Sequence, residues 1–126
     1  MNDSDRDFLA NQKNKEALKL YYAKDYNGAI KLYDEVLKFG EYDGAYNNRG
    51  NAYLNLNQYE RAIQDYNKAI QLNPNYFEAY NNRGWAYYCL KKYQQALKDF
   101  DKALELNPNN NQVKNNREAC LKAMGK

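Results

Sequence analysis

The stretch AYNNRGNAY, residues 45–53, returns as AYNNRGWAY at residues 79–87, 34 residues further along the chain. Downstream of it, YERAIQDYNKAIQLNPN (59–75) returns at the same distance as YQQALKDFDKALELNPN (93–109). The segment YNGAIKLYDEVLKFGEY (26–42) has the same skeleton 33 residues upstream. Self-similarity at a fixed period of this size indicates an array of repeated supersecondary units. The chain therefore contains one degenerate unit, two well-matched units and a remaining half unit.

Each well-matched unit predicts two helices joined by a turn. In the second unit, one helical stripe with spacing i, i+3, i+4 and i+7 consists of Tyr46, Arg49, Gly50 and Tyr53. A second stripe at helical spacing consists of Ala62, Tyr66, Ala69 and Ile70. The polar segment 55–59 suits a turn, and Pro74 and Pro108 end the second helices because proline lacks a donor and disfavours helical angles before it. Each unit is therefore predicted to be a hairpin of antiparallel helices.

Gly50 and Gly84 stand inside predicted helices, where glycine costs about 1 kcal/mol relative to alanine. A close approach of two helix backbones would offset this cost. We expect Gly50 to face Ala62 and Gly84 to face Ala96 across their hairpins. Under this packing, a leucine at residue 50 overpacks the hairpin and destabilises it by about 1–3 kcal/mol.

The spacing of these residues resembles the tetratricopeptide repeat. The resemblance rests in the second unit on Tyr46, Gly50, Tyr53, Ala62, Tyr66, Ala69 and Pro74, and in the third on Tyr80, Gly84, Tyr87, Ala96, Phe100, Ala103 and Pro108. The first unit keeps Ala17, Leu20, Tyr26, Ala29 and Tyr33, but it departs from the pattern at Lys13, Val36 and Glu41. The resemblance implies an all-α, right-handed superhelical solenoid of three helix hairpins plus a C-terminal capping helix.

The expected organisation is a single domain over residues 1–126. Its parts are repeat 1 at about 10–42, repeat 2 at about 43–76, repeat 3 at about 77–110 and the capping helix at about 111–124. In that last helix Glu118 replaces the glycine of the well-matched units, and Cys120 replaces their alanine. At the other end, SDRD (4–7) predicts a capping box with Ser4 as the N-cap of the first helix.

The resemblance also implies a concave face lined by the first helix of each hairpin. Residues of those helices outside the packing stripe are predicted to face this groove: Asn14, Lys15, Asn47, Asn48, Asn51, Asn55, Asn81, Asn82, Trp85, Tyr88, Asn115 and Asn116. An asparagine amide both donates and accepts, so a row of amides suits the backbone of an extended peptide, and Trp85 and Tyr88 would add apolar contact. Two alternatives stay open: these amides are solvated, or they bond to the neighbouring hairpin. For Tyr21 and Tyr22, core packing is at least an equal alternative, and for Trp85 the alternative is packing on the second hairpin.

Arg49, Arg83 and Arg117 lie in the packing stripe rather than on the predicted groove. We expect their stems to follow the helix interface and their guanidinium groups to pair with a carboxylate such as Asp65 or Asp99.

Some tetratricopeptide proteins clamp the acidic C-terminus of chaperones with two lysines, an arginine and asparagines. The matching places here hold Asn14, Leu18, Asn48, Glu78 and Asn82. Both lysines and the arginine are missing, so a dicarboxylate clamp is not expected.

Composition argues against several other classes of function. The chain has no histidine and its glycines are scattered singly, so we expect neither an enzyme nor a metal or cofactor site. The net charge of +3 comes from lysines interspersed with acids, which does not favour nucleic-acid binding. No apolar stretch approaches the roughly 20 residues of a membrane span, and the polar start favours the cytoplasm. Cys89 and Cys120 are expected to be buried, reduced thiols.

The predicted function is a non-catalytic protein–protein interaction scaffold that binds a peptide or partner segment in its concave groove. The alternative is a self-associating module that stacks end to end or docks its groove on another copy. Neither interpretation involves a small-molecule substrate.

Overall fold

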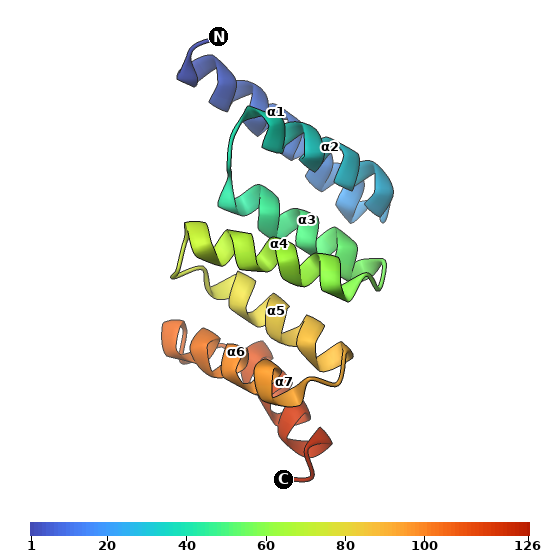
Figure 1. The fold of residues 1–126 in the computed structure, drawn as a ribbon, viewed down its shortest axis with the longest axis vertical. Helices are drawn as coiled ribbons and strands as arrows, with labels where there is room; N and C mark the ends of the chain where they lie inside the picture. The colour runs from blue at the N-terminus through green and yellow to red at the C-terminus, as the bar shows by residue number, and fades with distance from the viewer.

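The computed structural model describes residues 1–126 as seven α-helices joined by short turns (Figure 1). The helices are α1 (Asp3–Tyr22), α2 (Tyr26–Phe39), α3 (Asp43–Asn55), α4 (Tyr59–Leu72), α5 (Phe77–Cys89), α6 (Tyr93–Leu106) and α7 (Asn111–Ala123). They form three antiparallel hairpins, α1–α2, α3–α4 and α5–α6, followed by the single helix α7. The predicted all-α solenoid of three hairpins and a final helix is confirmed.

The hairpins stack in chain order, with the two termini at opposite ends of the stack (Figure 1). Each helix packs on the next one in sequence, and the first helices α1, α3, α5 and α7 also contact one another in turn. The second helices α2, α4 and α6 make no contact with one another. The first helices therefore lie along one side of the array, the inner side, and the second helices lie along the outer side.

The turn inside each hairpin has the same backbone geometry. Lys24, Asn57 and Lys91 occupy equivalent positions with φ values of 66°, 60° and 61°. The residue after each of them donates its N–H to a carbonyl in the last turn of the first helix, as Gln58 does to Tyr53 at 2.9 Å. This is the Schellman type of helix end, in which one left-handed residue satisfies otherwise unpaired carbonyls.

The second helices α4 and α6 end just before the prolines, as predicted. Helices α4 and α6 end at Leu72 and Leu106, and their C-caps Asn73 and Asn107 precede the prolines with φ values of −140° and −143°. The start of α1 was predicted wrongly at Ser4. Its N-cap is Asn2, whose Oδ1 accepts from the Asp5 N–H at 2.8 Å, because an asparagine side chain makes this bond as well as a serine does.

The two helical glycines face aromatic rings rather than alanines, so the predicted Gly50–Ala62 and Gly84–Ala96 contacts are wrong. A Cβ on Gly50 would lie 2.8 Å from Cε1 of Tyr66, and a Cβ on Gly84 would lie 2.8 Å from Cε1 of Phe100. Both rings are fully buried. Each glycine therefore leaves room for an aromatic side chain from the second helix of its hairpin.

The alanines of the second helices lie in core clusters that include residues of the following repeat. Ala62 belongs to one core cluster with Tyr66 and with Ala86 of α5, while Ala96 clusters with Cys120 of α7. Small residues thus allow close packing between successive hairpins, whereas the glycines allow it within a hairpin.

Pairing of the stripe arginines with carboxylates is confirmed. Arg49 donates from Nε and Nη2 to the two carboxylate oxygens of Asp65 at 2.9 and 2.7 Å, and Arg83 does the same to Asp99 at 2.8 and 2.7 Å. Burial raises the pKa of the Asp65 carboxyl, while the Arg49 guanidinium opposes the rise. Arg117 pairs instead with Asp101, at 2.6 Å.

The cysteines differ in burial. Cys120 is fully buried as predicted, but Cys89 is only half-buried because it lies on the last turn of α5, at the end of the hairpin. Burial raises the pKa of both thiols, which keeps them protonated near neutral pH. None of the seven helices combines the length and the apolar composition that a membrane span requires.

Candidate peptide-binding groove

The inner side of the array brings together most of the residues predicted to face the groove. Equivalent positions on α1, α3 and α5 hold Leu18, Asn51 and Trp85, one above the other along the stack. Between α1 and α3 lies a small cavity of about 90 Å³, lined by Leu18, Tyr21, Tyr22, Tyr33, Asn48 and Asn51. We call the surface formed by α1, α3 and α5 around these residues the groove face.

Part of the asparagine row bonds from one hairpin to the next. Asn82 donates its Nδ2 to Oδ1 of Asn47 at 3.3 Å, and Asn116 donates to Asn81 at 3.1 Å. Asn47 and Asn81 are only 5% and 8% exposed. The prediction that these two residues face a partner is therefore wrong, because they lie between successive first helices. The alternative, a bond to the neighbouring hairpin, holds for these pairs.

The equivalent bond between α1 and α3 is absent. Asn48 and Asn14 stand where Asn82 and Asn47 stand one repeat later, yet Oδ1 of Asn14 is buried without a partner. The Asn48 amide is half-buried and borders the cavity. The amide row is thus open at its N-terminal end, and Asn48 is available to an incoming group.

Two further asparagines of α3 make hydrogen bonds within the chain, but each keeps one hydrogen-bonding group of its amide free. Asn51 accepts from the Tyr66 hydroxyl at 2.6 Å, which leaves its Nδ2 available at the cavity. Asn55 donates from Nδ2 to the Tyr21 hydroxyl and to the Asn51 carbonyl, both at 2.9 Å, and it is exposed. At the ends of the row, Lys15 of α1 and Asn115 of α7 are exposed.

Two aromatic pairs flank the asparagines of α3. On α5, the rings of Trp85 and Tyr88 are stacked with centroids 5.0 Å apart, and Trp85 is 38% exposed. On α1, the rings of Tyr21 and Tyr22 are 5.4 Å apart. Tyr21 is half-buried against the first core cluster, whereas Tyr22 is 80% exposed. Core packing therefore accounts for Tyr21 but not for Tyr22.

Tyr33 of α2 is the groove-face residue that the sequence reasoning missed. Its side chain is fully buried beneath the cavity, its hydroxyl has no hydrogen-bond partner, and burial raises its pKa. The equivalent hydroxyl of Tyr66 bonds to Asn51, but in the first repeat Leu18 replaces that asparagine. In the third repeat the residue is Phe100, which has no hydroxyl to satisfy. Comparison of these two positions across the repeats would have revealed the unpaired group.

Stacked helical hairpins whose first helices share one inner face define an α-solenoid, a class of protein in which the inner surface is open to partners. The chain belongs to the tetratricopeptide repeat family, which its sequence matches at residues 44–76 and 77–110.

Several solved tetratricopeptide domains have the same fold. The first such domain of Spaghetti (RPAP3), bound to the HSP90 peptide SRMEEVD, is 30% identical with a TM-score of 0.90, covering 93% of this chain and 94% of that one. The second domain of human RPAP3, in complex with the HSP70 peptide SGPTIEEVD, is 28% identical with a TM-score of 0.87, covering 91% of this chain and 97% of that one.

A curated relative matches only part of the chain. Rat sperm-associated antigen 1 is 31% identical over 74 residues, which are 59% of this chain and 8% of the relative. The chain thus matches only a small part of that much longer protein.

Proposed function

We propose that this protein is a non-catalytic interaction scaffold whose groove face binds an extended segment of a partner protein. The observation that carries the proposal is the set of unengaged polar and aromatic groups on the groove face. The free amide of Asn48, the free Nδ2 of Asn51 and the exposed Trp85–Tyr88 stack all lie on consecutive first helices. Amides that both donate and accept match a peptide backbone, and a half-exposed tryptophan is a typical binding anchor.

The solved relatives support a peptide as the ligand, because two of them hold chaperone peptides that end in EEVD. Their acidic ligands do not transfer to this chain. The places that the family uses for a carboxylate clamp hold Asn14, Leu18, Asn48, Glu78 and Asn82, so the cations that neutralise such a peptide are absent. We infer a groove that holds a peptide by its backbone and by apolar side chains rather than by its charge.

The test is selection from a displayed library of random peptides of about eight residues. An extended chain advances ~3.3 Å per residue, so eight residues reach ~26 Å and can cross several of the first helices. Selected peptides are then measured against Asn48→Ala and Trp85→Ala. We expect each substitution to weaken binding by about tenfold.

The choice of variants follows from the hydrogen bonds. Asn48→Ala removes no bond within the chain, whereas Asn82→Ala would leave Oδ1 of the buried Asn47 unpaired and destabilise the array. Thermal unfolding of Asn48→Ala should therefore match the unsubstituted chain. Leu72→Ala, which removes an exposed side chain of α4 on the outer side, is the matched control and should bind normally. Undiminished binding by both groove variants would refute the proposal.

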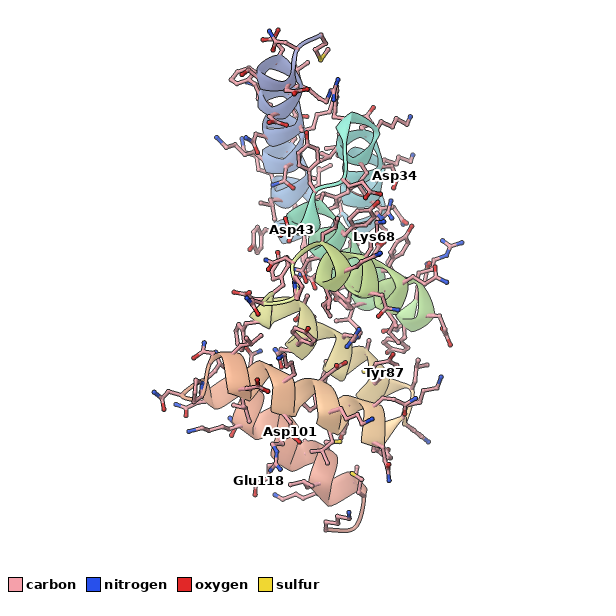
Figure 2. The ribbon with its side chains drawn as sticks, turned by 60° about the vertical axis from the view of Figure 1, so that its left-hand side comes forward. Asp34, Asp43, Lys68, Tyr87, Asp101 and Glu118 are labelled. Carbon is pink, nitrogen blue, oxygen red and sulfur yellow. The ribbon has the colours of Figure 1, made fainter.

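The sequence of α7 argues against the competing interpretation, which is self-association by end-to-end stacking. Glu118 stands at the position of Gly50 and Gly84, and it is exposed at the C-terminal end of the stack (Figure 2). A further helix packed there would meet a glutamate where the other hairpins leave only a hydrogen atom. Light scattering at increasing protein concentration tests this directly, and we expect a constant monomer mass.

A further inference from the structure

Helix α7 has one side on which no helix packs. Helices α1, α3 and α5 each pack against the second helix of their own hairpin, but α7 contacts only α5 and α6. Its uncovered side borders a hollow of about 390 Å³ at the C-terminal end of the stack, where Figure 2 shows Glu118. We call this surface the α7 face. It consists of Leu104 of α6 together with Lys114, Arg117, Glu118, Leu121, Lys122 and Lys126.

The repeats show which part of a hairpin the α7 face corresponds to. Residues 117–121 of α7 stand 34 positions after residues 83–87 of α5. In α5 this segment packs against the second helix of its hairpin, because Gly84 faces the ring of Phe100 and Tyr87 packs on the same core cluster. The α7 face is therefore the surface that a second helix covers in the other hairpins, and an α-helix is the shape that it fits.

Arg117 lacks one of the two partners that its equivalents have. Arg83 donates from Nη1 to Asn67 on the preceding second helix, and from Nε and Nη2 to Asp99 on the second helix of its own hairpin. The arginine of α3 bonds in the same way to two aspartates. Arg117 donates only from Nε, to Asp101 of the preceding α6, and its Nη groups make no hydrogen bond in the chain. A carboxylate on a helix packed over α7 would complete the pattern.

The charges of the α7 face favour an acidic occupant. Four cations and one acid line the hollow, an excess of cations as large as the net charge of the whole chain, +3. Asp101 pairs with Arg117, but the three lysines of the hollow form no ion pair within the chain. The adjoining hollow adds Lys98, and the acid nearest in sequence to Leu104, Glu105, is paired with Lys102. Carboxylates of a partner therefore meet a complementary surface here.

Glu118 restricts which helix fits. At its position α3 and α5 have glycine, and the buried rings of Tyr66 and Phe100 lie against those glycines. A second helix from another copy of this chain would place one of these rings against Glu118 and remove its charge from water at a cost. A helix with a small residue at that point avoids this cost. The half-buried side chains of Leu104 and Leu121 provide the apolar contact for such a helix.

From these observations we propose that the α7 face binds an acidic amphipathic helix of a partner protein. One carboxylate of this helix pairs with the free Nη groups of Arg117, and others lie near the lysines. A small residue faces Glu118, and apolar side chains pack on Leu104 and Leu121. The site goes beyond the proposed function, because it lies away from the groove face and recognises its partner by charge.

Helix α6 provides the template for a probe, because it covers the equivalent surface of α5. The probe is a capped, labelled peptide of residues 93–106 with three changes: Lys98→Glu, Lys102→Glu and Phe100→Ala. One control peptide keeps Phe100, and another carries Asp99→Asn in addition to the three changes. Binding is measured by fluorescence anisotropy at low salt, where charge attraction is least screened.

We expect saturable binding of the probe and at least tenfold weaker binding of both control peptides, because one meets Glu118 with a ring and the other has lost the carboxylate for Arg117. A free peptide of this length is largely unfolded. Binding should therefore also increase the helical circular dichroism signal.

Charge-reversal variants test the protein side. Lys114→Glu combined with Lys122→Glu should weaken probe binding at least tenfold, and both lysines are exposed and unpaired, so the fold is retained. Lys31→Glu combined with Lys38→Glu on α2 reverses two other exposed lysines and should bind the probe normally. Arg117→Gln should weaken the probe about tenfold but hardly change binding of the asparagine peptide, because that pairing is already lost.

Equal binding by the two charge-reversed proteins, or of the aspartate and asparagine peptides, would overturn the inference. Tighter binding of the peptide that keeps Phe100 would also overturn it, because the α7 face would then suit a second copy of this chain. Absence of binding by all three peptides would make α7 simply the solvated end of the array. The groove proposal stands under each of these outcomes, because none of the variants lies on the groove face.

Discussion

Tyr33 and Tyr66 form a natural matched pair, because they occupy equivalent places in consecutive repeats. Both side chains are fully buried. The Tyr66 hydroxyl donates to Oδ1 of Asn51 at 2.6 Å, while the Tyr33 hydroxyl has no partner. Replacing each by phenylalanine should therefore change stability in opposite directions. Phe100 occupies the same place in the third repeat and shows that the ring alone is sufficient there.

The magnitudes follow from the two environments. A buried polar group without a partner costs about 1–3 kcal/mol, so Tyr33→Phe should raise the free energy of unfolding by about that amount. A satisfied hydrogen bond contributes about 0.5–1.5 kcal/mol, so Tyr66→Phe should lower it by that amount, since water can replace the hydroxyl at the half-buried Asn51. At roughly 3–5 °C per kcal/mol for a domain of this size, the two variants should differ by several degrees in Tm.

The assay is guanidinium unfolding followed by circular dichroism, supported by thermal unfolding. Asn51→Ala in the Tyr66→Phe background is the control, and it should cost less than Asn51→Ala alone because the bond is already missing. If Tyr33→Phe destabilises the chain as much as Tyr66→Phe does, the Tyr33 hydroxyl has a partner in solution and the reasoning is refuted.

Three further predictions concern the stability of the array. Gly50→Ala should destabilise it by about 1 kcal/mol and Gly50→Leu by about 3 kcal/mol. The new Cβ would lie 2.8 Å from the buried Tyr66 ring, and this clash outweighs the gain in helix propensity. An unchanged midpoint of denaturant unfolding would contradict this packing. Lys91→Gly should stabilise by about 0.5–1 kcal/mol, because its φ of 61° is unstrained for glycine, and a lower Tm would count against that reasoning. Burial raises the folded-state pKa of Tyr33 and Tyr66, so their contribution to stability should be complete below about pH 10 and fall as the pH rises further. The fall should be shallower in Tyr33→Phe. Denaturant midpoints measured from about pH 8 to about pH 11 test this, and the same pH dependence of the midpoint in both chains would exclude a contribution of the Tyr33 hydroxyl.

The fold was predictable from the repeat because several independent signals in the sequence mark the same elements. Helical stripes, polar turns and Pro74 and Pro108 all mark the same hairpins, and the structure contains them. The partner of each glycine could not be predicted in the same way. Spacing shows which face of a helix is apolar, but it does not show which residue of the opposite helix lies above Gly50. That depends on the relative shift of the two helices, and the shift places Tyr66 there.

The groove was predictable as a face but not residue by residue. Asn47 and Asn48 are adjacent in sequence and were assigned together, yet consecutive residues of an α-helix point about 100° apart. Asn47 therefore lies buried between α3 and α5, while Asn48 borders the cavity. The unpaired hydroxyl of Tyr33 results from a missing hydrogen-bond partner. It can therefore be predicted only by comparing equivalent positions of two repeats.

Arg49 and Arg83 each connect three helices, and this has a consequence for how the array unfolds. Arg49 of α3 donates to Asp65 on α4 and also to Asp34 on the preceding α2, and Arg83 bridges Asp99 and Asn67 in the same way. In Figure 2, Asp34 and Asp101 lie far apart along the stack, at its N-terminal and C-terminal parts.

Contacts of this kind between neighbouring hairpins couple the units of a solenoid, so that opening one hairpin destabilises the next. Arg117 of α7 has only one such partner, Asp101 on the preceding α6. Amide exchange should accordingly be fastest in α7 and slowest around α3 to α5, so the molecule frays from its C-terminal end while the central hairpins keep the groove in shape.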